Sequence, residues 1–220
     1  ALSSAASDVY KRQALRRLTF MERLVSAMAE MNDSFNEVTA EMLKVISDYD
    51  SVTGFQGAYN IRQDSMCAGR KNSENITIES KTDKPGINIR IKPGTKGETV
   101  YIPACVTHSN VDDLVYNDFF IGEGADVTIV AGCGVHSDGS ETARHNGIHR
   151  FFLEKGAKVL YKEKHIGTGK GTGLRRIDPV TDAYLKEDSY LEMDTVQLRG
   201  VDRTTRSTSA VLDKGAKIVV

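Results

Sequence analysis

Six of the eight cysteine and histidine side chains in this 220-residue chain lie near one another in the sequence, and these are residue types that bind metals. They fall into two segments, each with a Cys-x-x-His spacing: Cys105, His108, Cys133, His136, His145 and His149. Thiolate together with imidazole is the ligand combination that suits iron–sulfur species, zinc or ferrous iron. A single histidine is better explained as a residue that lines a polar face or satisfies a turn. As a set, the six predict a site that holds iron or an iron–sulfur cluster transiently.

Spacing along the chain suggests which of these side chains can meet. Cys133 and His136 stand three residues apart with a glycine between them, so a turn could direct both at one ion. His145 and His149 would lie about 13 Å apart on a strand, at about 3.3 Å per residue. A helix is disfavoured by the glycine between them. We therefore expect a turn at residues 146–147 to bring these two histidines together.

The glycine-rich segment 167–173 resembles a phosphate-binding loop but fails the motif. Gly171 follows Lys170 at the position where the motif requires Ser or Thr. We expect a twisted or flexible loop instead. Because no other catalytic constellation is visible, we also expect that the chain is not an enzyme.

Composition excludes several classes of protein. The 29 Lys and Arg residues balance 30 Asp and Glu residues, for a net charge of −1, which argues against a general nucleic-acid binder. No run approaches the roughly 18 apolar residues that a membrane span needs. Three widely spaced cysteines form no CxxC pair, which favours free thiols in a reducing compartment, and so a cytoplasmic protein.

The first part of the chain has a helical pattern. Residues 1–13 show no period, and we expect a non-native or disordered tail there. Residues 14–54 form the expected helical region, in which Ser34 and Glu37 have the spacing of a capping box between two helices. Each of these helices has an apolar stripe at steps of three and four residues: Leu18, Met21, Val25, Met28 and Met31, then Val38, Met42, Val45, Ile46 and Tyr49.

From about residue 55 the apolar period changes to two, which predicts strands up to residue 220. The expected strands include 87–91, 114–121, 126–131, 150–153, 157–162, 189–193 and 216–220. The last of them stops at Val220 in mid-strand, and an uncovered strand is unusual at the end of a domain. We therefore expect a core over residues 55–220 that is incomplete at its C-terminus.

An internal repeat sharpens the expected fold. IGEGADVTIV (121–130), LEKGAKVLYK (153–162) and LDKGAKIVV (212–220) share a Gly-Ala pair followed by apolar alternation, and LKEDSYLEM (185–193) is a weaker copy. Glycine supplies the positive φ of a corner, and stacking of such units buries faces that no unit buries alone. The sequence predicts a mainly β solenoid; a sandwich with Gly-Ala hairpins is the alternative.

Two stretches of the sequence, 57–103 and 112–169, resemble the SufB/SufD family. The most specific element is AGCGVHSDG followed by HNGIH, within residues 131–149. The resemblance implies a right-handed parallel β-helix and a scaffold for iron–sulfur cluster assembly. It implies as partners a SufC-like ABC ATPase, a sulfur donor protein, and a second copy or a SufB/SufD paralogue in a dimer. It also implies a sulfur-accepting cysteine, for which Cys133 is the candidate.

Two other functions remain open at this point. A β-helix enzyme acting on polysaccharide would need clustered carboxylates with Arg or Lys on one solenoid face. A purely structural interaction protein would need no chemistry at the histidines at all. We expect no partner that is a nucleic acid or a membrane.

Overall fold

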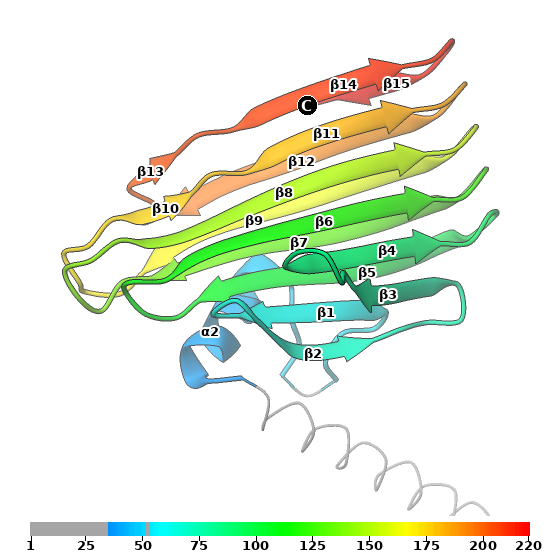
Figure 1. The fold of residues 1–220 in the computed structure, drawn as a ribbon. Helices are drawn as coiled ribbons and strands as arrows, with labels where there is room; N and C mark the ends of the chain where they lie inside the picture. The colour runs from blue at the N-terminus through cyan, green and yellow to red at the C-terminus, as the bar shows by residue number, and fades with distance from the viewer. Residues whose placement is uncertain (1–34, 52) are drawn as a thin grey trace, which may run out of the picture.

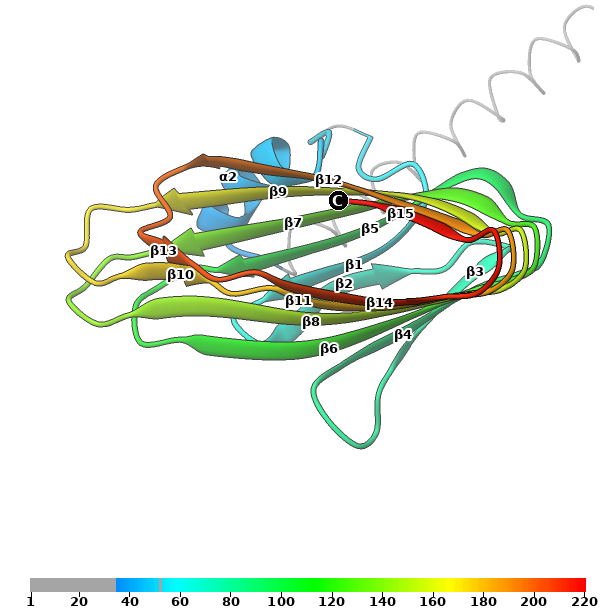
Figure 2. The same cartoon turned by 90° about the horizontal axis from the view of Figure 1, so that it is seen from above.

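The computed structural model describes residues 35–51 and 53–220, which form one helix and two facing β-sheets (Figure 1). The predictions for residues 1–13, for the stripe from Leu18 to Met31 and for Ser34 lie outside the described residues. In Figures 1 and 2 the strands of one sheet run in one direction and those of the other return, while the chain climbs steadily. The path is a right-handed parallel β-helix, so the predicted fold class is confirmed.

Each sheet contributes one strand or pair of strands to every coil. The first sheet has seven strands in the spatial order β15-β12-β9-β7-β5-β1-β2. Their bounds are β1 Ala58–Gln63, β2 Met66–Lys71, β5 Lys96–Val106, β7 Asp126–His136, β9 Lys158–Thr168, β12 Tyr190–Arg199 and β15 Lys217–Val219. The facing sheet has eight: β3 Ile76–Ser80, β4 Gly86–Ile91, β6 Asp112–Ile121, β8 Ala143–Leu153, β10 Arg175–Ile177, β11 Val180–Leu185, β13 Arg203–Thr204 and β14 Ser207–Leu212. Pairing is parallel except in the first hairpins, β1–β2 and β3–β4.

The repeat in the sequence forms the tight corners of the solenoid. Five equivalent corner residues have positive φ: Gly94, Gly124, Gly156, Asp188 and Gly215. At the first four corners, the backbone amide of the corner residue donates to a carbonyl oxygen in the following coil, that of the residue just before the corner there. For example, Gly124 N donates to Lys155 O at 2.9 Å. The residue after the corner points inward, and Ala125 and Ala157 are fully buried there. Asp188 occupies the corner in the weaker copy, so that copy is a true coil.

The spacing between repeats follows the pairing of the coils. Lys158 on β9 pairs with Tyr190 on β12, and Tyr190 in turn pairs with Lys217 on β15. The coil from Tyr190 to Lys217 therefore contains fewer residues than the coil from Lys158 to Tyr190. The segment between the corners at Gly156 and Gly215 therefore comprises one long and one short coil. Stacked hairpins of a sandwich would require antiparallel pairing, which between the named strands is limited to β1–β2 and β3–β4.

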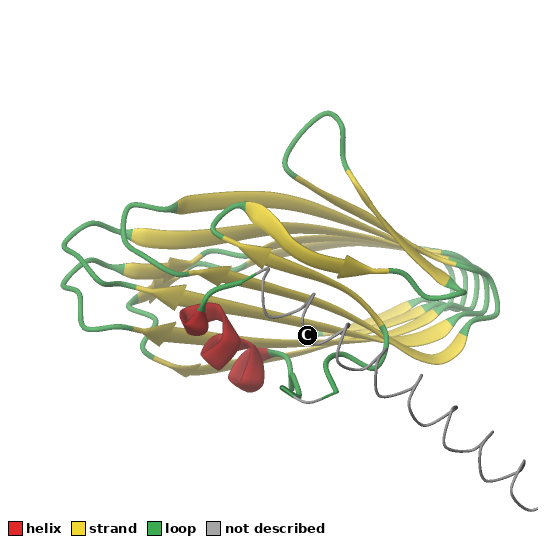
Figure 3. Ribbon diagram, turned by 90° about the horizontal axis from the view of Figure 1, so that it is seen from below, coloured by secondary structure: helices red, strands yellow, loops and turns green. Residues whose placement is uncertain are grey.

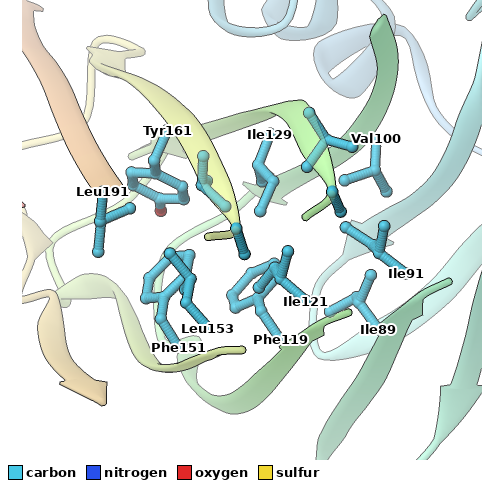
Figure 4. Close-up of a cluster of buried hydrophobic side chains, with 14 of the residues drawn as sticks. Ile89, Ile91, Val100, Phe119, Ile121, Ile129, Phe151, Leu153, Tyr161 and Leu191 are labelled. Atoms are coloured by element: carbon cyan, nitrogen blue, oxygen red, sulfur yellow. The ribbon is translucent and has the colours of Figure 1, made fainter. Parts of the chain in front are cut away.

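The space between the sheets near the corners is a continuous apolar core (Figure 4). Phe119 and Phe151 stack at its centre with ring centroids 4.5 Å apart, and Tyr161 contacts Phe151 edge-on at 5.3 Å. Isoleucine, leucine and valine side chains from both sheets complete it, pointing toward one another in Figure 4. Burial of this surface is the main stabilising contribution that the coils share.

Helix α2, Glu37–Ile46, lies on the outer face of the first sheet (Figure 3). Its N-cap is Asn36, whose side-chain oxygen accepts a hydrogen bond from the amide of Thr39. The helix therefore begins two residues later than the expected capping box at Ser34 predicts. The helix packs directly against β7, because a Cβ on Gly132 would stand 2.4 Å from the Ile46 carbonyl oxygen. No helix in the described part of the chain is long and apolar enough to span a membrane.

Several strands are longer than the apolar pattern predicts, and some were missed. Strand β7 continues to His136, β8 begins at Ala143, and β9 continues to Thr168. These extensions carry polar inward side chains, so the apolar period ends before the strand does. The expected set also lacks β10, β11 and β13, of which β10 and β13 are only three and two residues long.

Candidate functional site

Beyond the apolar core, the space between the sheets becomes polar. The inward positions on β1, β6, β7, β8 and β9 carry buried or nearly buried polar side chains that we call the polar lumen: Asn60, Arg62, Asp113, Asn117, Cys133, His145, His149, Glu163 and His165. Part of it surrounds a cavity of about 20 Å³ that Cys133, His145 and His149 line together with Arg62. That volume suits a single water-sized species.

Three side chains of the polar lumen are close enough to share one metal ion. Ligand atoms of Cys133, Glu163 and His165 all lie within 4.8 Å of one another, and all three residues are buried. Cys133 on β7 pairs in register with His165 on β9, and Glu163 stands two residues earlier on the same face. Because strand alternation puts residues two apart on one face, the parallel register itself assembles the group.

Glu163 is the most strongly compensated charge in this group. Tyr161 donates its hydroxyl to Glu163 Oε1 at 3.1 Å, Arg206 Nη2 lies 2.5 Å from Oε2, and His165 Nε2 lies 3.3 Å from Oε1. Burial opposes its ionisation, but the contact with His165 and the positive charge of Arg206 outweigh burial, so the pKa of Glu163 lies well below its ordinary value. Glu163 is therefore a carboxylate at neutral pH.

Cys133 is a neutral thiol in this environment. Burial raises the pKa of Cys133 well above its ordinary value, and the negative charge of Glu163 raises it further. A buried thiol is a poor nucleophile until it loses its proton. Because a thiol must be deprotonated to bind a metal, metal binding here would release a proton.

Asp113 positions His145 at the edge of the same cavity. His145 Nδ1 donates to Asp113 Oδ2 at 3.0 Å, and Arg62 donates to Asp113 Oδ1 through Nε and Nη2 at 3.0 and 2.7 Å. Burial opposes the charge of Asp113, but the bonds from His145 and Arg62 outweigh it and hold the pKa well below its usual range. A carboxylate on Nδ1 fixes the orientation of the ring, an arrangement that is common behind metal-bound histidines.

His145 and His149 approach each other without a turn. Both lie inward on β8, and Gly147 between them is also in the strand, so the expected turn at residues 146–147 is wrong. A Cβ on Gly147 would stand 2.7 Å from His149 Nε2 and 3.4 Å from His145 Nε2. Both imidazoles therefore occupy the space that a side chain at Gly147 would fill. Their Nε2 atoms are closer together than the spacing of His145 and His149 along the strand implies.

His149 is buried as a neutral imidazole. Burial lowers its pKa from 6.5 to about 4, a shift that the negative charge of Glu163 only partly offsets. Its ring lies 5.9 Å from the rings of both Phe119 and Tyr161, at the boundary with the apolar core. Its Nδ1 has no hydrogen-bond partner among the described residues. A buried polar atom without a partner marks a position where a ligand or water is expected.

The other predicted ligands lie elsewhere. His136 is on the opposite face of β7 from Cys133, because the two residues are an odd number apart on one strand, so the expected turn between them is absent. His136 Nδ1 pairs with Thr168 Oγ1 at 2.9 Å in a surface groove of about 700 Å³. Cys105 is buried among side chains beneath α2, and His108 is exposed.

The glycine-rich segment 167–173 has a structural explanation. Gly171 N donates to Ser137 O, and a Cβ on Gly171 would stand 2.5 Å from Gly139 O. Its glycines allow this loop to stack directly on the loop of the preceding coil. The expectation of a loop rather than a phosphate site agrees with this contact.

Glu163, His165 and Asp113 were not among the predicted site residues. The signal that could have revealed them is the repeat itself, because a step of one full coil places Cys133 beside His165. The same step places Asp113 beside His145. Alignment of the coils would have found both pairs, whereas short local spacing could not.

The fold and this buried group define a class: a parallel β-helix with thiol, imidazole and carboxylate side chains that could bind a metal inside its lumen. The chain is similar to two curated proteins of Methanothermobacter thermautotrophicus, both named as iron–sulfur cluster assembly SufBD family proteins. It is 32% identical to that of strain Winter and 30% identical to that of strain Delta H, each over 89 residues. The resemblance to the SufB/SufD family is thereby confirmed.

The similarity covers part of each protein. The matched residues are 40% of this chain and 21% of each relative, so the chain spans about a fifth of the length of the curated relatives it matches. No protein-family model matches the chain. No solved structure matches it.

Proposed function

We propose that this chain is a non-catalytic scaffold for iron–sulfur cluster assembly, whose polar lumen receives iron or sulfur. The observation that carries the proposal is the buried group of Cys133, Glu163 and His165, with His145 and His149 beside it. The names of the two relatives support the same role. Iron and sulfide are the cargo in this proposal, and the thiol is the group that would accept them.

The energy source and the partners belong to the same proposal. A scaffold without its own nucleotide site would need a separate ATPase of the SufC-like ABC type, a sulfur donor protein, and a second copy or a SufB/SufD paralogue. The three free cysteines, Cys67, Cys105 and Cys133, are compatible with a reducing cytoplasm. Co-purification of the chain with such an ATPase tests the partnership directly.

Anaerobic reconstitution with ferrous iron and sulfide tests the scaffold role. We expect the protein to acquire the absorption of an iron–sulfur cluster, and Cys133→Ser and His145→Ala to lose most of it. Cys67→Ser is the control for an exposed thiol, and Cys105→Ala is the control for a buried thiol outside the lumen. Normal cluster assembly by both Cys133→Ser and His145→Ala would remove the lumen from the proposal.

A carbohydrate-active enzyme is the alternative that the geometry favours less. The lumen cavity of about 20 Å³ is far too small for a sugar. Such an enzyme would have to use the surface groove, where the polar side chains are those of His136, Asp138, Thr168, Lys170 and Arg199. Activity on a panel of polyuronides, abolished by Asp138→Asn, would support this alternative.

A further inference from the structure

Arg206 reaches the polar lumen from the last coil. It lies between β13 and β14, 43 residues after Glu163, and its Nη2 lies 2.5 Å from Glu163 Oε2. The Glu163 side chain is fully buried, whereas 26% of the Arg206 side chain is exposed. The guanidinium therefore stands between the buried carboxylate and solvent.

The carboxylate that Arg206 neutralises is also a member of the candidate metal group. A divalent ion on Cys133, Glu163 and His165 would place a second positive charge beside the guanidinium, in a region where water screens charges poorly. We propose that Arg206 holds the place of a divalent metal ion on Glu163, so that metal loading displaces the guanidinium. The identification of that ion as ferrous iron rests on the proposed function; the exchange itself does not.

The exchange balances in charge and protons. Before loading, the neutral thiol of Cys133, the carboxylate of Glu163 and the guanidinium of Arg206 sum to zero. After loading, a divalent ion with a thiolate and a carboxylate also sums to zero. One proton leaves Cys133 Sγ and the Arg206 side chain moves to solvent, without any oxidant or reductant. Neutrality matters because an uncompensated charge in the interior is costly.

The structure around Arg206 suits such a movement. The backbone on either side is held, since Thr205 N donates to Asp178 Oδ1 at 3.1 Å and Ser207 N donates to Pro179 O at 3.2 Å. The side chain itself is held less completely, because Nη1 is buried without a hydrogen-bond partner among the described residues. The side chain can thus leave the lumen while the coil remains in place.

Atoms that would face a bound ion are also incompletely bonded. His165 Nε2 has no hydrogen bond within the described residues, although Glu163 Oε1 is 3.3 Å away. His149, which lines the same cavity as Cys133, also has a buried Nδ1 without a partner in this part of the chain. The unpartnered Nε2 of His165 beside the Glu163 carboxylate indicates that the arginine satisfies the charge of the site but not its hydrogen-bonding or coordination capacity.

Titration with Co²⁺ alone, under anaerobic conditions, tests the exchange. We expect the native protein to bind Co²⁺ with a thiolate-to-cobalt charge-transfer band, and Glu163→Gln to lose most of this binding. Arg206→Gln should bind Co²⁺ roughly tenfold to a hundredfold more tightly, the range that neighbours of ligands contribute. Arg203→Gln, an exposed arginine on β13, is the matched control and should bind like the native protein. Unchanged or weaker binding by Arg206→Gln, or no thiolate band in the native protein, overturns the inference.

A second measurement uses the native protein and is independent of any variant's folding. Modification of arginines by phenylglyoxal, followed by mass spectrometry, should be faster at Arg206 in the Co²⁺-loaded protein than in the metal-free protein. Arg203 should react equally in both. Equal reactivity of Arg206 in the two states would contradict the exchange. Because neither iron nor sulfide is used, a protein that exchanges Co²⁺ but assembles no cluster would contradict only the proposed scaffold function.

Discussion

The two halves of the solenoid interior share the same strands but have opposite chemistry. On β8, Phe151 and Leu153 point into the apolar core, whereas His145 and His149 point inward from the same face of the same strand. On β9, Val159 belongs to the apolar core and Glu163 to the polar lumen. The backbone pairing is continuous through both halves.

This comparison shows how a solenoid can separate stability from chemistry. The corner half buries aliphatic and aromatic side chains coil upon coil, which stabilises every strand it contains. The polar half then carries buried charges whose net contribution to stability is small or unfavourable. Because both halves lie on the same strands, the apolar core holds the register that brings Cys133 beside His165.

The largest expected effect is loss of packing in the apolar core. Phe151→Ala removes a fully buried ring stacked on Phe119 and should lower the free energy of unfolding by about 3–5 kcal/mol. Urea denaturation followed by circular dichroism measures it. Phe152→Ala, one residue along and outward-facing, is the control and should cost clearly less. Equal losses would mean that the apolar half is not the main stabilising region.

The next effect is a pH dependence that belongs to the polar half. Folding lowers the pKa of His149 from 6.5 to about 4. Between these values the unfolded chain binds a proton that the folded protein does not, so stability falls with falling pH, by roughly 3 kcal/mol in full. His149→Phe should remove this part of the dependence. Stability curves of the two proteins that stay parallel from pH 7 to pH 4 would contradict the burial of a neutral imidazole.

A smaller effect is expected where the two histidines converge. Gly147→Ala adds a Cβ 2.7 Å from His149 Nε2, which must push the ring aside. We expect a loss of about 1–3 kcal/mol in stability from overpacking. Cluster reconstitution and thermal denaturation together measure the consequence. A variant that is as stable as the native protein and assembles cluster normally would show that the open space above Gly147 is not needed.

The smallest effect concerns the corners. Asp188 has φ 57°, a conformation that costs an L-residue roughly 1–2 kcal/mol and glycine far less. Asp188→Gly should therefore stabilise the protein by about 1 kcal/mol, and Gly156→Asp should destabilise it by a similar amount. Thermal denaturation of both variants measures the pair. Changes of the same sign would show that the two corners are not equivalent.

The difference between the halves also explains which elements could be predicted. The strands that contribute to the apolar core, such as β4 and the first part of β9, show plain alternation in the sequence. The ends of the strands that line the polar lumen show no apolar alternation, so the sequence predicted these strands as too short. The apolar stripe predicted helix α2, but the sequence placed its N-cap at Ser34. In the structure the side chain of Asn36 accepts the free amide of Thr39, so Asn36 is the N-cap.

The candidate site was predicted in part. Cys133, His145 and His149 do line one cavity, while His136, Cys105 and His108 lie outside it. Whether any of these residues binds iron stays a prediction. Alternation alone assigns Cys133 and His136 to opposite faces once both are known to be on one strand.

The sequence by itself favoured the solenoid over a sandwich, because the repeated glycine corner and the alternation that follows it encode one coil at a time. It also determined which residue types could bind a metal. Only the tertiary structure decided which of them meet, because the ligands come from different coils and are joined by the parallel register between those coils. The placement of Arg206 on Glu163, across 43 residues, is decided by tertiary structure for the same reason.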